Sequence, residues 1–150
     1  MARYDDESIV GYEHKEWTDP IQRFTQISDF TLDIIKDTYN PKIYIEGYSF
    51  GSKGQGLFQI AENCGILKHK LLLNKNTNYT TIVPSVVKKR ATNKGNANKE
   101  LMYNAISEES NVPKDYQKTL RPKSTKLTNP TTDIVDSYWI CKYGWKDSIA

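Results

Sequence analysis

The sequence predicts an α/β fold in which helices flank a mixed sheet. Segments with apolar residues at helical spacing alternate with short segments rich in β-branched and aromatic residues. The order helix, strand, helix, strand, helices is typical of parallel strands joined by crossover helices. At 150 residues the chain has the length of one domain, so we expect residues 1–150 to share a single core.

The first half of the chain begins with a polar, weakly patterned segment, residues 1–18, in which one short strand is expected near residues 9–12. A helix is predicted from Asp19, a capping residue, to about Tyr39, where Asn40 and Pro41 end it. The stretch "KIYIEGYSF" follows and predicts a strand that ends at Gly47. The glycine-containing loop "GSKGQG" then leads into a second helix.

The second half starts with "YTTIVP", the other clear strand, which Pro84 closes. A short helical piece, "SVVKKRA", a loop, and a third helix over residues 99 to about 108 come next. Residues 111–130 are a polar connection with several lysines and prolines. The last helix is expected to start at Thr131 or Thr132 and to bury the apolar residues of "DIVDSYWIC".

Composition and charge limit the classes of function that the chain can have. The net charge of +3 is mild, but lysines and arginines crowd residues 88–99 and again residues 114–126. Cys64 and Cys141 lie in helical apolar patterns, and two cysteines form no disulfide framework, so we expect reduced core residues. No stretch is suited to a signal peptide or a membrane span, and a soluble, cytoplasmic protein without a membrane partner is expected.

Three acids are candidates for chemistry. Asp133 and Asp136 lie three apart on the last helix and project the same way, although the helix dipole alone would favour an acid in the first turn. Glu46 ends an apolar strand, where α/β sheets place ligand sites, although a solvent-facing strand position would also suit it. Together these carboxylates could converge on Mg²⁺, which prefers oxygen ligands and supports phosphodiester hydrolysis.

The segments "IYIEGYSFGSKGQGLFQIAENCGIL", "VPSVVKKRATNKGNANKELM" and "DIVDSYWIC" occur in a specific order and spacing. In that combination, over roughly residues 19–145, the chain resembles RuvC-like Holliday-junction resolvases, especially the phage crossover junction endodeoxyribonucleases, within the RNase H-like superfamily. The resemblance implies a metal-dependent endonuclease that cuts branched DNA such as four-way junctions. It also implies Mg²⁺ as cofactor with Mn²⁺ as substitute, a homodimer, and the host cytoplasm if a phage encodes the chain.

Site residues follow from the same resemblance, position by position. Glu46 matches the second catalytic acid, and Asp133 and Asp136 match the acidic pair of the final helix; all three are expected to hold the metal. DNA contacts are expected from lysines on helices and loops, for which a solvated helix face is the alternative, and from an aromatic residue after Glu46, for which core packing is the alternative. These DNA-binding candidates are Lys53, Lys88, Lys94, Lys99, Tyr48 and Phe50.

The chain departs from the family pattern at its start. The family opens with a strand that bears the first catalytic Asp, and neither Asp5 nor Asp6 stands in such a strand. We therefore expect a resolvase fold without its first strands and its first acid. Three functions remain open: a structure-selective endonuclease or its C-terminal part, a non-catalytic branched-DNA-binding protein derived from a resolvase, and an unrelated small α/β interaction protein.

Overall fold

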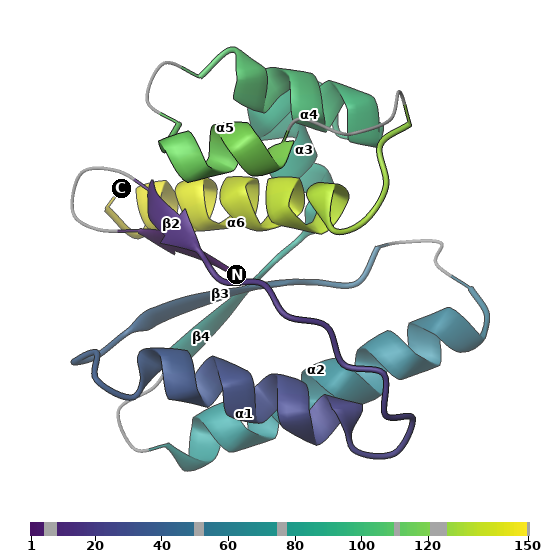
Figure 1. Ribbon diagram of the computed structural model, residues 1–150, viewed down its shortest axis with the longest axis vertical. Helices are drawn as coiled ribbons and strands as arrows, with labels where there is room; N and C mark the ends of the chain where they lie inside the picture. Colours follow the sequence, from purple (N-terminus) through teal and green to yellow (C-terminus); the bar gives the residue numbers. More distant parts are fainter. Residues whose placement is uncertain (5–8, 50–52, 75–77, 110–111, 121–125, 150) are drawn as a thin grey trace. The chain divides into compact units, whose positions relative to one another are not determined.

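The computed structural model describes most of the chain, and its elements are labelled in Figure 1. The described ranges are residues 1–4, 9–49, 53–74, 78–109, 112–120 and 126–149. The chain divides into two compact units, one of Met1–His14 with Ile82–Ala150 and one of Lys15–Thr81. We call them the α6 unit and the β3–β4 unit, and we describe each by itself. The expectation of a single domain stays a prediction.

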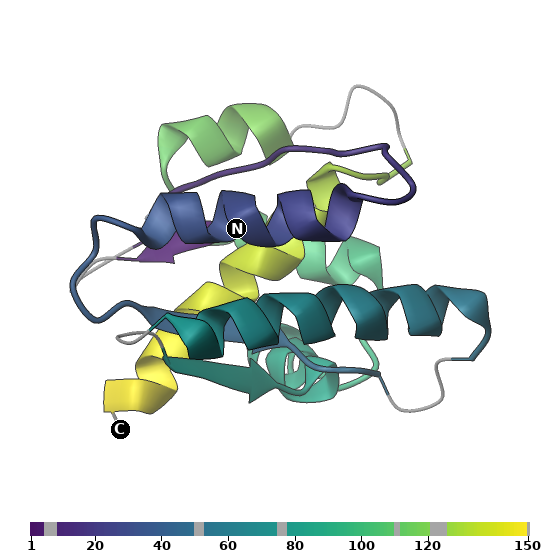
Figure 2. The ribbon, with the colours of Figure 1, turned by 90° about the horizontal axis from the view of Figure 1, so that it is seen from below.

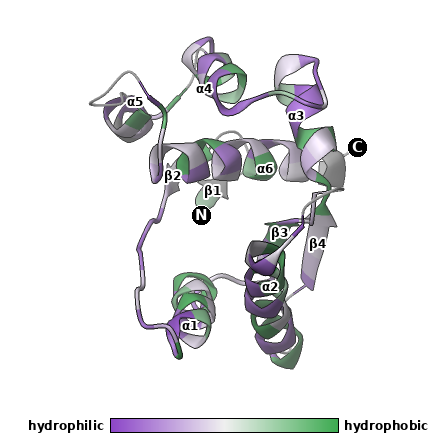
Figure 3. Ribbon diagram, turned by 90° about the vertical axis from the view of Figure 1, so that its right-hand side faces the viewer, coloured by the Kyte–Doolittle hydropathy of each residue, from purple (hydrophilic) through white to green (hydrophobic). Residues whose placement is uncertain are grey.

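The β3–β4 unit is a β-α-β arrangement with one additional helix. Strand β3 (Lys42–Glu46) pairs with β4 (Asn78–Ile82), and helix α2 (Gln55–Leu73) joins them, so the two strands run parallel as the sequence predicts. Helix α1 (Arg23–Ile35) packs along α2, as Figure 2 shows from below. Hydrophobic positions follow both helices in Figure 3.

Contacts between α1 and α2 hold this unit together. Leu71 of α2 and Ser28 of α1 are completely buried. The Ser28 hydroxyl donates to the Thr25 carbonyl, so its burial leaves no unsatisfied donor. At the surface, the Lys70 ammonium pairs with the Asp29 carboxylate at 2.5 Å.

Helix α1 begins later than the sequence predicts. The Asp19 carboxylate accepts from the amides of Ile21 at 2.8 Å and Gln22 at 3.0 Å, so Asp19 does cap, but it closes a separate turn. The α-helix then starts at Arg23. Strand β3 similarly ends at Glu46, one residue before the predicted Gly47.

The α6 unit is built around one long helix. Helix α6 (Thr131–Ile149) lies between an antiparallel hairpin, β1 (Ala2–Tyr4) with β2 (Ile9–Tyr12), and three helices (Figure 1). Those helices are α3 (Pro84–Thr92), α4 (Lys99–Ser107) and α5 (Lys114–Leu120). Because α6 has neighbours on several sides, it buries residues around much of its circumference. Its buried residues include Ile134, Val135, Tyr138, Trp139 and Ile140.

Trp139 is the centre of this core. Its side chain is 1% exposed, and its indole N–H donates to the Met102 carbonyl of α4 at 3.2 Å. Tyr138 packs edge-on against Trp139 and against Tyr116 of α5. The indole hydrogen bond therefore connects α6 with α4, and the Tyr138–Tyr116 contact connects α6 with α5.

Two elements of the α6 unit differ from the sequence prediction. The N-terminal segment was expected to form one strand, but it forms a hairpin because β1 finds a partner in β2 and both contact α6. Helix α5 lies inside the segment predicted as a polar connection. Its buried apolar side chains are Tyr116 and Leu120, one turn apart. Two apolar residues among polar neighbours are too few to predict a helix from the sequence.

The two cysteines are free thiols, as expected, but both are only partly buried. Burial raises the pKa of the Cys141 thiol to about 11, so it is protonated at neutral pH. Within the described residues, no helix is both long and apolar enough to cross a membrane.

Candidate functional site

The acidic pair lies at the start of α6, as the sequence predicts. Asp133 stands in the first turn and is exposed, whereas Asp136, one turn further on, is half-buried. The first turn is fixed by the buried Thr132, whose hydroxyl donates to the Asn129 side-chain oxygen. Positions three apart on a helix share one side, so the two carboxylates belong to the same surface.

Asp136 has an unusual electrostatic environment. Burial is the main cause, and the negative charge of Asp133 a second one, of a pKa of Asp136 that is raised to about 6. Lys88 and Lys99 oppose this rise. At pH 7 the group is mostly ionised, but it is a carboxylate that gains more than most from a nearby cation.

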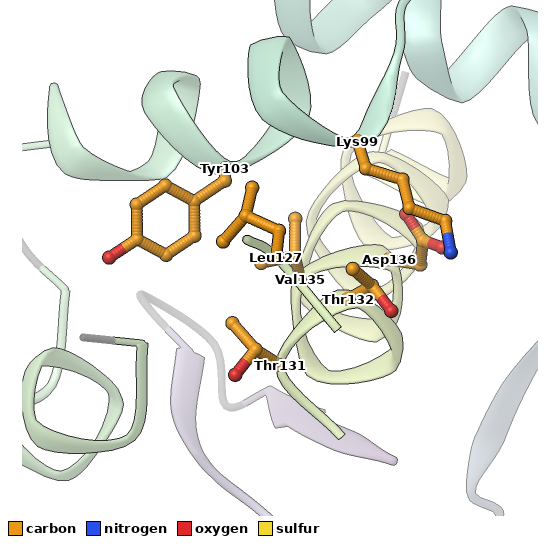
Figure 4. Close-up of a pocket in the computed structure, with 7 residues that line it drawn as sticks. All are labelled: Lys99, Tyr103, Leu127, Thr131, Thr132, Val135 and Asp136. Atoms are coloured by element: carbon orange, nitrogen blue, oxygen red, sulfur yellow. The ribbon is translucent and has the colours of Figure 1, made fainter. Parts of the chain in front are cut away.

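A small pocket opens beside Asp136, and Figure 4 shows the side chains around it. Lys99 extends from the start of α4 toward Asp136, while Tyr103 lies at the far side of Leu127. The enclosed space of about 10 Å³ has room for roughly one water molecule. It is therefore large enough for a water molecule and too small for a base or a sugar.

The lysines that were expected to contact DNA occupy different positions. Lys88 on α3 is half-buried and Lys99 is the exposed first residue of α4, and both act electrostatically on Asp136. Lys94 is exposed in the loop after Asn93, which ends α3 with a positive φ of 63°. The Lys94 amide donates to the Thr92 hydroxyl at 3.2 Å, which orders that loop. The structure thus brings Lys88 and Lys99 to the acidic pair.

The other candidates belong to the β3–β4 unit. Glu46 is exposed at the end of β3, Tyr48 is 44% exposed just after it, and Lys53 is exposed before α2. Phe50 lies outside the described residues, as do Asp5 and Asp6. Because Glu46 and the two aspartates belong to different units, their meeting at one metal stays a prediction.

Lys68 is a residue that the sequence analysis missed. From α2 its ammonium lies 5.6 Å from the centre of the Tyr48 ring and 5.8 Å from that of Tyr79 on β4. Burial raises the pKa of the nearby Cys64 thiol, Lys68 lowers it, and Glu46 raises it, so these groups share one electrostatic neighbourhood. The signal in the sequence is the spacing of Cys64 and Lys68, one helical turn apart.

The chemistry of the donors fits a hard divalent ion in kind. Mg²⁺ keeps several waters and is commonly held by one or two carboxylates, which Asp133 and Asp136 supply. Among the side chains that the structure describes, no group of three or more His, Cys, Asp or Glu is arranged to hold a metal. The acidic pair therefore offers two ligands, in a place where a positive charge would relieve their repulsion.

Comparison with known proteins bears on the fold. The sequence matches none of the protein families and none of the curated proteins against which it was compared. A solved structure, the RuvC of Thermus thermophilus, is similar, with a TM-score of 0.61 and 12% identity over 99% of this chain and 86% of that one. The chain has a RuvC-like fold. The expected α/β, RNase H-like class is thereby confirmed.

Proposed function

We propose that the chain is a RuvC-like resolvase, a metal-dependent endonuclease that acts on four-way junctions or other branched DNA. The observation that carries the proposal is the pair Asp133 and Asp136 on α6, with Lys88 and Lys99 acting on Asp136, in a RuvC-like fold. Carboxylates beside lysines suit phosphodiester chemistry, because the acids hold a divalent ion and the lysines attract the phosphate.

In this proposal each residue of the acidic pair has a stated task. Asp133 and Asp136 would hold Mg²⁺ or Mn²⁺, with Glu46 as a third ligand. The ion would activate water and stabilise the leaving oxygen. Lys99, which extends toward Asp136, would hold the scissile phosphate against the carboxylates, and Lys88 would keep Asp136 ionised.

The remaining residues would bind DNA without reading its sequence. Lys53 and Lys94 are exposed, as phosphate contacts require, and Tyr48 would stack at the junction centre, a role for which Phe50 is the alternative. A homodimer would present two such sites to the two symmetric strands of a junction. We also propose a cytoplasmic location, in the host if a phage encodes the chain.

Nicking of a synthetic four-way junction tests the proposal. The chain, its Asp136→Asn and Asp133→Asn variants, and Asp37→Asn as a control at an exposed aspartate of the β3–β4 unit are incubated with Mg²⁺ or Mn²⁺. We expect little or no cleavage, because no residue matches the family's first acid, and we expect any cleavage that is measured to be lost in the first two variants only. Cleavage that persists in Asp136→Asn would contradict the assigned site.

Gel-shift titration separates the endonuclease from the non-catalytic alternative. The chain should bind a four-way junction more tightly than a linear duplex of equal length, with affinity falling steeply as salt rises. Selective binding without any nicking, in either metal, would favour the branched-DNA-binding protein. Equal affinity for both DNAs would remove the structure-selective claim.

A further inference from the structure

Tyr143, near the end of α6, is held in a fixed orientation. Its ring stacks on the buried Trp139, with centroids 5.6 Å apart and planes at 11°. Its hydroxyl donates to the Arg90 carbonyl of α3 at 3.0 Å. Burial raises the pKa of Tyr143, which keeps the hydroxyl protonated as a donor. The ring thus forms a rigid platform that joins α6 to α3.

Three cations surround this ring. The Arg90 guanidinium carbon and the Lys142 ammonium each lie 6.0 Å from the ring centre, and the Lys146 ammonium lies 5.7 Å from it. Lys142, the least exposed of the three, forms an ion pair with Glu109. Arg90 and Lys146 are exposed. Attraction to the face of the ring helps to hold these like charges together at the surface.

The cations around Tyr143 and the acidic pair lie along the same side of α6. Asp136 and Tyr143 are seven residues apart on α6, so they lie on one side of the helix, two turns or about 10 Å apart along its axis. Helix α3 follows the same order, since Lys88 acts on Asp136 while Arg90 contacts Tyr143. Positive charge is therefore present at both places along one side of the helix.

We infer that Arg90 and Lys146, held by the Tyr143 ring, form a second surface that binds the nucleic-acid backbone. The inference rests on the proposed function, because it places this surface on the strand whose scissile phosphate lies at Asp133 and Asp136. The rise along the axis of a duplex is about 3.4 Å per nucleotide, and successive phosphates of one strand are further apart than this rise, so 10 Å spans at most about three nucleotides. The surface therefore holds a phosphate within about three nucleotides of the cut.

A backbone ligand fits this surface better than a base does. One face of the ring is covered by Trp139, and cations lie within 6.0 Å of its centre, so a base has little room to stack, whereas a phosphate would meet positive charge. Contacts of this kind carry no sequence information. We therefore expect the surface to raise affinity equally for all sequences and to position the strand for the acidic pair.

Salt dependence of DNA binding measures the contribution of the surface. The full chain and the Arg90→Gln/Lys146→Gln variant are titrated with a four-way junction at several salt concentrations, without divalent metal. Each lost phosphate contact should reduce the slope of log affinity against log salt by about 0.9, so we expect a reduction of about 2. The control is Lys36→Gln/Lys42→Gln, two exposed lysines of the β3–β4 unit that change the net charge equally.

Position is tested with neutral phosphates. Methylphosphonate is placed one at a time along the strand around the cleavage site, and binding is measured again. The chain should lose affinity at a phosphate within about three nucleotides of the cut, and the Arg90→Gln/Lys146→Gln variant should lose none there. Tyr143→Phe, which keeps the ring, should bind as the unaltered chain does, whereas Tyr143→Leu should resemble the double variant.

The possible outcomes separate this inference from the proposed function. If the unaltered chain binds junctions and the double variant shows the same slope as the Lys36→Gln/Lys42→Gln control, the second surface is refuted while the proposed function stands. If the unaltered chain does not bind DNA, the proposed function itself fails. Circular dichroism of each variant shows that it is folded, and because all four substituted cations are exposed, we expect unchanged spectra.

Discussion

At the scale of a single residue, Asp136 must be ionised to bind a cation and is at the same time half-buried, and these two conditions usually conflict. A carboxylate is a ligand for a cation only when it is ionised, yet half-burial beside Asp133 makes ionisation costly and raises the pKa of Asp136 to about 6. Lys88 and Lys99 offset part of that cost. A bound cation would remove the rest of this free-energy cost and would therefore bind more tightly.

The first prediction concerns stability and pH. The pKa of Asp136 rises from 3.8 in the unfolded chain to about 6 on folding, so stability should fall as the pH rises from about 4 to about 6 and stay low above that. Asp136→Asn removes this loss. At pH 8 its free energy of unfolding should exceed that of the unaltered chain by up to about 3 kcal/mol.

Urea denaturation at pH 4 and pH 8 measures the difference. At pH 4 the two chains should be nearly equal, because Asp136 is protonated in the folded state there. Asp37→Asn, at an exposed position, is the control and should show no such pH dependence. An identical effect of Asp136→Asn at both pH values would mean that Asp136 does not titrate near 6.

The second prediction concerns metal binding by the same residue. Protons and Mg²⁺ compete for Asp136, so Mg²⁺ should raise the melting temperature more at pH 8 than at pH 5. Asp136→Asn should remove most of that difference. Differential scanning fluorimetry with MgCl₂ and with NaCl of equal ionic strength checks this, and a shift that NaCl reproduces would exclude a specific site.

At the scale of elements, the start of α4 determines where Lys99 is. The Asn98 side chain accepts from the Leu101 amide at 2.9 Å and so caps the helix whose first residue is Lys99. The same helix is anchored in the core, since the Met102 carbonyl accepts from the Trp139 indole. Lys99 can therefore extend toward Asp136 because both helices are fixed by contacts away from the site.

The third prediction follows from this cap. Asn98→Ala should lower the free energy of unfolding by about 1 kcal/mol, because one amide at the start of α4 loses its acceptor. Asn98→Asp should retain stability, since a carboxylate is also a good cap and suits the helix dipole. Thermal denaturation measures both. Asn96→Ala, an exposed residue of the preceding loop, is the control, and an equal loss there would refute the role of the cap.

At the scale of the whole molecule, the chain passes between its two units at Lys15 and at Ile82. The second passage is short, because β4 ends at Ile82 and α3 begins at Pro84. A connection this short leaves no long flexible linker at that point, which favours cooperative unfolding.

The fourth prediction is that the two units unfold together, as expected of a single domain. In Trp17→Phe the remaining tryptophans, Trp139 and Trp145, report on the α6 unit alone, whereas far-UV circular dichroism reports on both units. The fluorescence and circular dichroism transitions in urea should coincide. Separate midpoints would instead show that the β3–β4 unit and the α6 unit are independent domains.

The sequence by itself determined the class of fold, the two paired strands β3 and β4, most of the helices, and the position of Asp133 and Asp136 on one side of α6. These features follow from local periodicity and from capping and breaking residues, which act over a few positions. Features that local periodicity does not encode were missed or misplaced. They include the β1–β2 hairpin, the short helix α5, and Lys68 beside Tyr48.

Only the tertiary structure decided the environment of those residues. The same two aspartates at the same spacing would titrate normally on an exposed helix; it is the packing of α3 and α4 on α6 that half-buries Asp136 and brings Lys88 and Lys99 to it. The cations around Tyr143 likewise come from two helices far apart in the sequence. Spacing sets which side of an element a residue occupies, but burial and charge depend on what packs against that side.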